Sequence, residues 1–358
     1  MTTPRATITA MQYCLPPRVL GQEELAARFG EKQVADIAKL SGITERRIAE
    51  PDVTSVDLAE CAARRLMAAH AIEPDTIEMI IFASQTGDYQ LPASACVLHG
   101  RLGLPKTCGA FDIGLGCSAF PYALSVANGL IASGTVKGRV LLINADTLTH
   151  IIHPQDRGLV PLHGDGAVAA LLEPTTGEDG LLGFELGSDG SGAEHLVVPA
   201  SGARRPRTAE TSREIVDTSG SVTTDEHLHM NGPAVFQFSI REVPAALKRA
   251  FEKWQIAPAE LDLLVLHQAN RMMLDLIYKK AGIGPEQQFF FMEKVGNMSG
   301  ASSPMALAEA WRSGRLKPGT LIAVAAFGVG LSWGAALIRL PDSLADCSAA
   351  PVDYSPED

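Results

Sequence analysis

The sequence predicts an α/β fold built from two similar halves. Its 358 residues can bury a large core. Short apolar runs alternate with amphipathic helical stretches, which is typical of mainly parallel sheets covered by helices. The order of these elements in the first half recurs in the second. We therefore expect one βα unit at residues 1–175, a second at 176–340, and a disordered tail at 341–358.

The first half contains three apolar runs that predict buried strands. Residues 78–84 (EMIIFAS) form the first, and the helical pattern at 91–102 follows it. Residues 139–145 (RVLLINA) and 166–173 (GAVAALLE) form the other two. Runs of this length, rich in Ile, Val and Leu, are expected in strands that are buried on both faces.

The second half repeats this order. The run at 261–266 (LDLLVL) corresponds to the first strand, and 271–281 corresponds to the helix after it. Residues 321–326 and 333–340 correspond to the remaining two strands. The repeat is much longer than a solenoid period, so duplication of a whole βα unit is the better interpretation.

Two uncharged stretches, 113–136 and 321–338, are long enough for membrane-spanning helices. Glycines, a proline and an asparagine interrupt the first, and a glycine turn divides the second. We expect both to lie in the buried centre of the fold, with no membrane partner. The polar, Ser/Thr-rich residues 201–229 predict a mobile loop or lid.

Charge and cysteine content exclude several classes of function. The formal net charge of −11 argues against nucleic acid as a general partner. The six cysteines show neither a CxxC pair nor metal-ligand spacing, so no metal site is expected. The N-terminus lacks a signal-peptide pattern. Reduced thiols in a cytoplasmic protein are the simplest interpretation.

Cys117 is the strongest candidate nucleophile. A strand is predicted to end near Ile113, Gly114 and Gly116 form a turn, and an apolar helix begins at about Cys117. A thiol at a helix N-terminus is expected to have a lowered pKa. The alternative is a small buried hydrophobic residue, as most free cysteines are.

Three further segments at the ends of predicted strands and helices contain candidate functional residues. His267 lies where the strand at 261–266 ends, a position that commonly lines an active crevice; a structural histidine is the alternative. Asn297 lies in a Gly/Ser turn before a helix at 304–311, where it could equally be a cap or turn residue. The cluster 328–330 (GVG) could place a backbone N–H near a reacting carbonyl, or simply form a buried turn.

Together these segments resemble β-ketoacyl-acyl-carrier-protein synthase III, a condensing-enzyme family of the thiolase superfamily. The resemblance covers about residues 8–340 and is collinear. Its motifs are Cys117, HQAN at 267–270, VGNMSGASSP at 295–304, FGVGLSWGAAL at 327–337, GITERRIA at 42–49, LPASAC at 91–96, DRG at 156–158, HGDGAVAAL at 163–171 and GRLKPG at 314–319.

The resemblance implies a thiolase-like fold with five layers, α-β-α-β-α, and a two-stage reaction. Cys117 would take an acyl group from a thioester. His267 and Asn297 would then stabilise the enolate formed when a malonyl-type thioester loses carbon dioxide. The backbone N–H groups of Cys117 and Val329 would form the oxyanion hole. Acyl-coenzyme A or acyl-carrier protein and malonyl-acyl-carrier protein would be substrates, with no cofactor.

Departures from the family pattern concern the acyl donor. The resemblance implies substrate contacts at Arg157, Gly232, Asn270 and Leu91. Asp36 and Leu40 stand where the bacterial family has the Trp and Arg that bind adenine. Leu91 replaces a Phe that closes the acyl pocket from the partner subunit. These changes, and the longer loop at 201–229, favour a longer or specialised acyl donor.

The same resemblance implies a homodimer and docking of an acyl-carrier protein. The docking candidates are the basic residues Arg249, Arg271, Lys279 and Lys280. Ordinary solvated helix faces explain these residues equally well. Two functional alternatives stay open at this point. One is a same-fold acyltransferase or thioesterase that does not decarboxylate, and the other is a non-catalytic subunit of a heterodimer.

Overall fold

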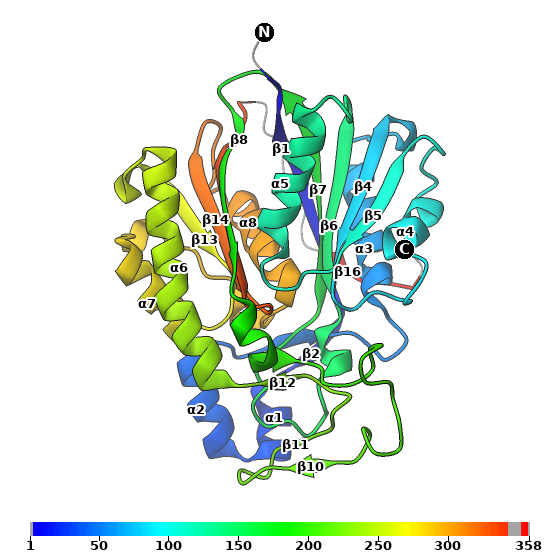
Figure 1. The fold of residues 1–358 in the computed structure, drawn as a ribbon, viewed down its shortest axis with the longest axis vertical. Helices are drawn as coiled ribbons and strands as arrows, with labels where there is room; N and C mark the ends of the chain where they lie inside the picture. Colours follow the sequence, from blue (N-terminus) through cyan, green and yellow to red (C-terminus); the bar gives the residue numbers. More distant parts are fainter. Residues whose placement is uncertain (1–2, 343–351, 357–358) are drawn as a thin grey trace.

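The protein is described by a computed structural model that covers residues 3–342 and 352–356. Two sheets are stacked with helices between them and on both outer faces, as Figure 1 shows. The first sheet has the order β16-β1-β7-β6-β4-β5 and the second β13-β14-β15-β8. Their strands are β1 (Arg5–Leu15), β4 (Ile77–Ala83), β5 (Gly109–Ile113), β6 (Arg139–Asp146), β7 (Gly166–Thr175), β16 (Val352–Asp353), β8 (Gly180–Ser188), β13 (Leu263–Leu266), β14 (Leu321–Gly328) and β15 (Ser332–Arg339).

The two halves share one strand pattern. In the first sheet β1 and β6 both run antiparallel to β7, and β4 runs parallel to β6. In the second sheet β8 and β14 run antiparallel to β15, and β13 runs parallel to β14. The predicted boundary at 175/176 falls between β7 and β8, where the chain passes from one sheet to the other.

The helices complete five layers. Helices α5 (Ala119–Ala132) and α8 (Ser302–Arg312) lie between the sheets and share one apolar core with both. Helices α3 (Ser55–Ala69) and α4 (Ser94–Arg101) pack on the outer face of the first sheet. Helices α6 (Gly232–Trp254) and α7 (Arg271–Ala281) cover the outer face of the second. The predicted five-layered α/β fold is therefore confirmed.

The expectation of mainly parallel sheets is wrong, because both sheets are mixed. The residues that join β14 to β15 are only Val329 to Leu331. A connection this short can join antiparallel strands only, since parallel strands need a long crossover. The uncharged stretches 113–136 and 321–338 do lie in the centre, as α5 and the β14–β15 pair. Within the described ranges we find no helix with the length and apolar character needed to cross a membrane.

Shorter elements cover the lower end of the molecule in Figure 1. They are β2 (Arg18–Leu20), α1 (Gln22–Phe29), α2 (Glu31–Ser41), β3 (Arg46–Ile48), β9 (Leu196–Val197), β10 (Ile215–Val216), β11 (Val222–Thr223) and β12 (His229–Met230). Short 3₁₀ helices occur at Pro74–Thr76, Leu148–Ile151, Gly190–His195, Pro258–Glu260, Pro285–Gln287, Met292–Lys294 and Ser299–Ala301.

The loop at 201–229 has more structure than its composition predicts. Strands β10 and β11 form a small antiparallel pair within it. The backbone N–H of Val222 donates to the Gln155 carbonyl at 3.2 Å, and that of Leu228 donates to the Ile151 carbonyl at 2.7 Å. The loop, which belongs to the second half, is thus hydrogen-bonded to the segment at 151–157 of the first half.

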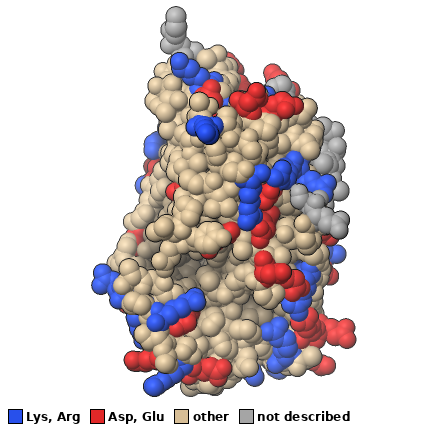
Figure 2. All heavy atoms as spheres, turned by 90° about the vertical axis from the view of Figure 1, so that its right-hand side faces the viewer, with Lys and Arg blue, Asp and Glu red and all other residues tan. Residues whose placement is uncertain are grey.

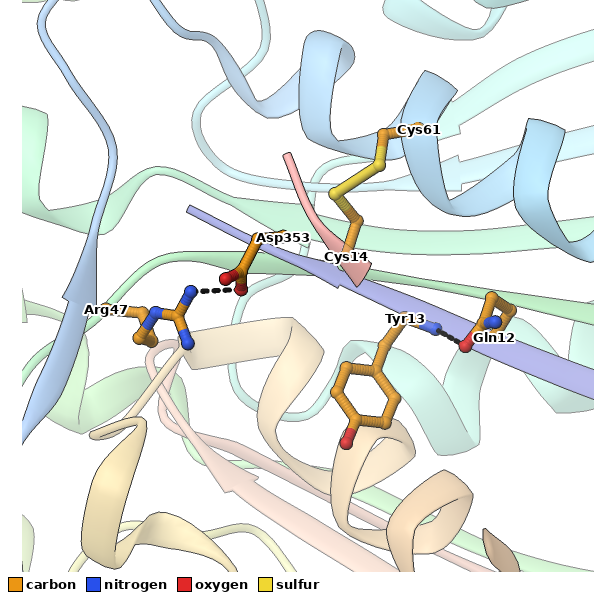
Figure 3. Close-up of a disulfide and its surroundings, with 6 residues drawn as sticks. All are labelled: Gln12, Tyr13, Cys14, Arg47, Cys61 and Asp353. Carbon is orange, nitrogen blue, oxygen red and sulfur yellow. Dashed lines mark hydrogen bonds and ion pairs between the residues drawn. A yellow bond between two sulfur atoms is a disulfide. The ribbon is translucent and has the colours of Figure 1, made fainter. Parts of the chain in front are cut away.

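Two sequence expectations near the C-terminal end of β1 need correction. Residues 352–356 are not a disordered tail: β16 pairs in parallel with β1, and Tyr354 N–H donates to the Leu15 carbonyl at 2.8 Å. An ion pair between Arg47 and Asp353 adds to this contact (Figure 3). Residues 343–351 and 357–358 lie outside the described residues.

The second correction concerns the cysteines, which were expected to be reduced. Cys14 on β1 and Cys61 on α3 form a disulfide with their Cα atoms 6.1 Å apart, shown in Figure 3. The two residues are 47 positions apart in sequence and meet only because α3 packs on β1. Cys96, Cys108 and Cys117 are free thiols.

Candidate active site

One large cavity brings together residues from both halves of the chain. Its volume is about 750 Å³, and its wall is mostly apolar. Cys117 reaches it from the turn before α5, His267 from the residue after β13, and Asn297 from the turn before α8. Gly232, Asn270 and Val329 also line it. Six of the residues singled out in the sequence therefore meet at one place.

Glycines allow the backbone to approach Cys117 closely. A Cβ atom at Gly328 would lie 2.7 Å from the Cβ and 2.8 Å from the sulfur of Cys117. A Cβ atom at Gly116 would lie 2.1 Å from Oε1 of Gln85 and 2.8 Å from Cγ1 of Val329. Any larger residue at either position would displace the thiol or the turn at 328–330.

The pKa of Cys117 differs from the sequence expectation. Removal from water raises the pKa of this thiol to about 11. Hydrogen bonds from Ser299, whose Oγ lies 3.9 Å from the sulfur, and from the backbone of Val329 and of Cys117 itself act in the opposite direction and are smaller. The expectation of a lowered pKa at a helix N-terminus is wrong here because burial dominates. The resting side chain is a thiol, which must lose its proton when it reacts.

His267 is a neutral imidazole. Its side chain is buried, and its ring packs edge-to-face on Phe327 with centroids 5.7 Å apart. Burial, with a smaller contribution from His163, lowers the pKa of His267 to about 3. Nδ1 is buried and has no hydrogen-bond partner among the described residues. Nε2 is then the nitrogen left to face the cavity.

This buried histidine predicts acid sensitivity. Below pH 6.5 the unfolded chain binds a proton at His267 that the folded chain does not bind until about pH 3. Stability should therefore fall as the pH drops through this window, by about 2 kcal/mol between pH 7 and pH 5 from this residue alone. Urea unfolding at both pH values would measure it, with His267→Gln as the comparison. An equal loss of stability in both proteins would contradict the prediction.

Asn297 is oriented by the turn that follows it. Its Oδ1 accepts hydrogen bonds from the Ser299 N–H at 3.0 Å and from the Ser302 hydroxyl at 3.2 Å. Its backbone N–H donates to the Leu162 carbonyl at 2.9 Å. Because Oδ1 is occupied, the amide NH₂ group is the part that remains for a ligand. A neutral amide can donate to a developing negative charge without taking up a proton.

The sequence did not single out Asp146, which supports this turn. Its carboxylate lies at the end of β6 and is fully buried. It accepts from the Gln85 N–H at 2.9 Å, from the Ser84 hydroxyl at 3.2 Å and from the Gly300 N–H at 3.0 Å. A polar residue at the carboxyl end of a buried strand was the available signal.

Two predicted substrate-binding residues lie away from the cavity. Leu91 is 82% exposed. Arg157 donates to Oε1 of Gln33 on α2 at 3.4 Å and packs near Gly220 of the loop at 201–229. Asp36 forms an exposed ion pair with Lys32 at 2.7 Å on the same helix. Asn270, which does line the cavity, uses its Oδ1 to cap α7 by accepting from Met273 N–H.

The four docking candidates lie on the neighbouring helices α6 and α7. Arg249 pairs with Glu185 at 3.2 Å, and its guanidinium lies 6.0 Å from the centre of the Trp333 ring. Arg271 pairs with Asp275 at 2.9 Å and stacks on Phe290 at 3.9 Å. Lys280 donates to the Ile240 carbonyl, while Lys279 is in the last turn of α7.

Sequence similarity to known proteins identifies the family of this chain. Residues 111–190 match the family model "3-Oxoacyl-[acyl-carrier-protein (ACP)] synthase III", and residues 251–340 match its C-terminal model. The β-ketoacyl-[acyl-carrier-protein] synthase III of Rhodopirellula baltica is 37% identical over 91% of this chain and 95% of its own. That of Symbiobacterium thermophilum is 37% identical over 93% of this chain and 97% of its own.

Similarity to solved structures leads to the same family. A crystal structure of a 3-oxoacyl-(acyl-carrier-protein) synthase III superposes with a TM-score of 0.91 and 42% identity, covering 94% of this chain and all of that one. The 3-oxoacyl-(acyl-carrier protein) synthase of Burkholderia xenovorans gives 0.89 and 33%, covering 99% and 98%. These relatives do not favour the hydrolytic or non-catalytic alternatives. The chain belongs to the β-ketoacyl-acyl-carrier-protein synthase III family, and it is a condensing enzyme with the thiolase-like fold.

Proposed function

We propose that this enzyme joins an acyl group held on Cys117 to the two-carbon unit of a malonyl-type thioester. The observation that carries the proposal is the convergence of Cys117, His267 and Asn297 on one cavity. The substrates would be acyl-coenzyme A or acyl-carrier protein and malonyl-acyl-carrier protein, with no cofactor. The reaction would serve fatty acid or polyketide-like synthesis in the cytoplasm.

In the first stage the sulfur of Cys117 attacks the acyl thioester. The thiol proton passes to the departing thiolate, and the acyl group stays on the enzyme. Because burial raises the pKa of Cys117 to about 11, the proton has to leave as the new bond forms. The backbone N–H groups of Cys117 and Val329 would stabilise the oxyanion of this transfer. The backbone of both residues lowers the pKa of the thiol by hydrogen bonding, so these groups lie next to the sulfur at which the oxyanion would form.

In the second stage the malonyl carboxylate leaves as carbon dioxide. Its bonding electrons form an enolate on the thioester, and the enolate carbon attacks the acyl group on Cys117. The Cys117 thiolate leaves and takes up a proton from water to restore the thiol, and a β-ketoacyl thioester is released. Nε2–H of His267 and the Asn297 amide would donate to the enolate oxygen. The neutral state of His267 and the occupied Oδ1 of Asn297 both fit donation.

A longer or specialised acyl donor is part of the proposal. The cavity is large and mostly apolar, with Leu148, Leu196, Leu228 and Phe236 in its wall. Apolar surface of this kind favours a hydrocarbon chain. Gly232 and Asn270 would contact the donor within the cavity. The exposed Lys32–Asp36 ion pair stands where the family's adenine-stacking residue is expected, which favours a donor carried on a protein.

The proposed partners are an acyl-carrier protein and a second copy of the chain. Arg249, Arg271, Lys279 and Lys280 would meet the acidic carrier protein on α6 and α7. The dimer would use the side of the molecule with α4 and β5, where Leu91 and Tyr89 are exposed. Figure 2 shows a broad area without charged side chains on this side. Leu91 would then reach the partner subunit's acyl pocket.

The proposed dimer interface can be tested by a substitution at Leu91. Leu91→Asp should weaken self-association at least about tenfold, because a carboxylate would be buried in the interface. Light scattering coupled to size-exclusion chromatography would measure it. Leu40→Asp is the matched control, since Leu40 is 55% exposed on α2 at the other end of the molecule. A monomeric wild type, or equal weakening in both variants, would contradict the prediction.

A panel of acyl donors tests the proposed function. The intact protein is incubated with acetyl, branched and medium-chain donors on coenzyme A and on a carrier protein, and adducts are read by mass spectrometry. We expect an acyl adduct on Cys117, formed faster with the longer chains. No adduct with any donor would refute the proposal.

A further inference from the structure

The active-site cavity contains a second histidine that the proposed mechanism does not use. His163 lies just after the 159–162 turn, and its side chain is 7% exposed. It lines the same cavity as His267 and Asn297 and contributes electrostatically to the low pKa of His267. His163 therefore shares its cavity with the two side chains that are proposed to bind the thioester oxygen.

The hydrogen bonding of His163 fixes its tautomer. Nδ1 lies 3.0 Å from the carbonyl oxygen of Leu159. A carbonyl oxygen only accepts, so Nδ1 carries the hydrogen. Burial holds the pKa of His163 below its ordinary value, so the ring is neutral. Nε2 therefore presents a lone pair, and among the described residues it has no hydrogen-bond partner.

The backbone holds this acceptor rigidly beside Asn297. Asn297 N–H donates to the Leu162 carbonyl at 2.9 Å, and Gly164 N–H donates back to the Asn297 carbonyl at 3.0 Å. A Cβ atom at Gly164 would lie 2.2 Å from the Val295 carbonyl oxygen, so the two segments are in close contact. The acceptor of His163 and the free amide donor of Asn297 thus belong to one fixed unit.

The wall of the cavity provides no charged group that could pair with Nε2 of His163. The described residues that line the cavity include no Lys, Arg, Asp or Glu. A ligand that places an apolar group against Nε2 would leave a buried acceptor unpaired, which is costly. Sites of this kind discriminate strongly against analogues that lack the expected donor.

We propose that His163 is a specificity-determining residue whose Nε2 accepts a hydrogen bond from an N–H or O–H group next to the thioester carbonyl of the substrate. The inference rests on the proposed function, since it assumes a thioester in this cavity. The donor has two possible sources: the amide N–H of a pantetheine-like arm, or a hydroxyl on the acyl unit.

Two matched pairs of thioesters separate these sources. The first pair compares the N-acetylcysteamine and n-pentyl thioesters of butanoate, which have arms of equal length and differ in the amide. The second compares the N-acetylcysteamine thioesters of 3-hydroxybutanoate and butanoate, which differ in the hydroxyl. The readout is kcat/KM for acylation of Cys117, measured by thiol release and by intact mass, in the wild type, His163→Phe and His163→Gln.

The wild type should prefer the donor-bearing member of one pair by about tenfold or more. His163→Phe should abolish that preference, and His163→Gln, which keeps an acceptor oxygen, should retain part of it. Thermal melting checks folding, and His163→Met replaces the Phe variant if that one does not fold. The pair that responds identifies the source of the donor.

Three results would overturn the inference. They are a wild type without preference in either pair, ratios unchanged in the variants, and an equal loss for all thioesters, which a purely space-filling role would give. Failure of the proposed function looks different: wild-type Cys117 would then form no adduct with any of these thioesters.

Discussion

Cys117→Ala should lower the rate of acyl-enzyme formation on the order of 10⁴-fold or more, so that no adduct is detected. Cys117 is a free thiol that lines the cavity, and the Ser299 hydroxyl and the backbone of Val329 form hydrogen bonds to its sulfur. No other described side chain of the cavity is a comparable nucleophile. Intact-protein mass spectrometry after incubation with the best donor would show the adduct in the wild type only.

Cys96 provides the matched control for this variant. It is a free and exposed cysteine on α4, outside the cavity. Cys96→Ala should keep the adduct and its rate. An adduct on Cys117→Ala that forms at the wild-type rate would show that the acyl group is carried elsewhere.

His267→Ala should leave acylation of Cys117 intact and lower carbon dioxide release about 10²–10³-fold. Burial lowers the pKa of His267 to about 3, so the ring is a weak proton acceptor for the thiol, and hydrogen-bond donation is the role that we propose for it. Loss of that donor leaves the enolate oxygen with Asn297 alone. The rate of ¹⁴CO₂ release from labelled malonyl-carrier protein, with adduct formation followed in parallel, separates the two stages.

Asn297→Ala should show the same division of effects as His267→Ala, since both side chains would contact one oxygen. The substitution also removes the Oδ1 acceptor of the Ser299 N–H and the Ser302 hydroxyl, so thermal melting would check that the variant keeps its fold. Equal loss of acylation and decarboxylation in His267→Ala would instead make His267 a base for Cys117. The enzyme would then resemble hydrolytic Cys-His enzymes in mechanism.

Apolar periodicity predicted much of the fold. The run at 139–145 became β6, the helix at 271–281 became α7 without change, and the run at 321–326 became β14 with two further residues. The two strands are almost entirely buried, and α7 buries one face through Met273, Leu274, Ile277 and Tyr278, so burial accounts for their apolar patterns. The positions of Cys117, His267 and Asn297 followed, because each lies where a predicted strand or turn ends.

Features that depend on long-range packing were not predictable in the same way. The disulfide between Cys14 and Cys61 requires α3 to lie on β1, and β16 requires a partner strand at the other end of the chain. The pKa of Cys117 was wrongly predicted because the helix position was visible in the sequence and the depth of burial was not. His163 escaped notice because its free nitrogen becomes apparent only with the Leu159 contact.

A single-turnover measurement tests the central claim most directly. Isolated enzyme carrying an acyl group on Cys117 is mixed with malonyl-carrier protein, and the adduct, carbon dioxide and β-ketoacyl product are followed together. We predict that one carbon dioxide and one β-ketoacyl thioester appear for each adduct lost. Loss of the adduct to water or to another acceptor, without carbon dioxide, would contradict the account.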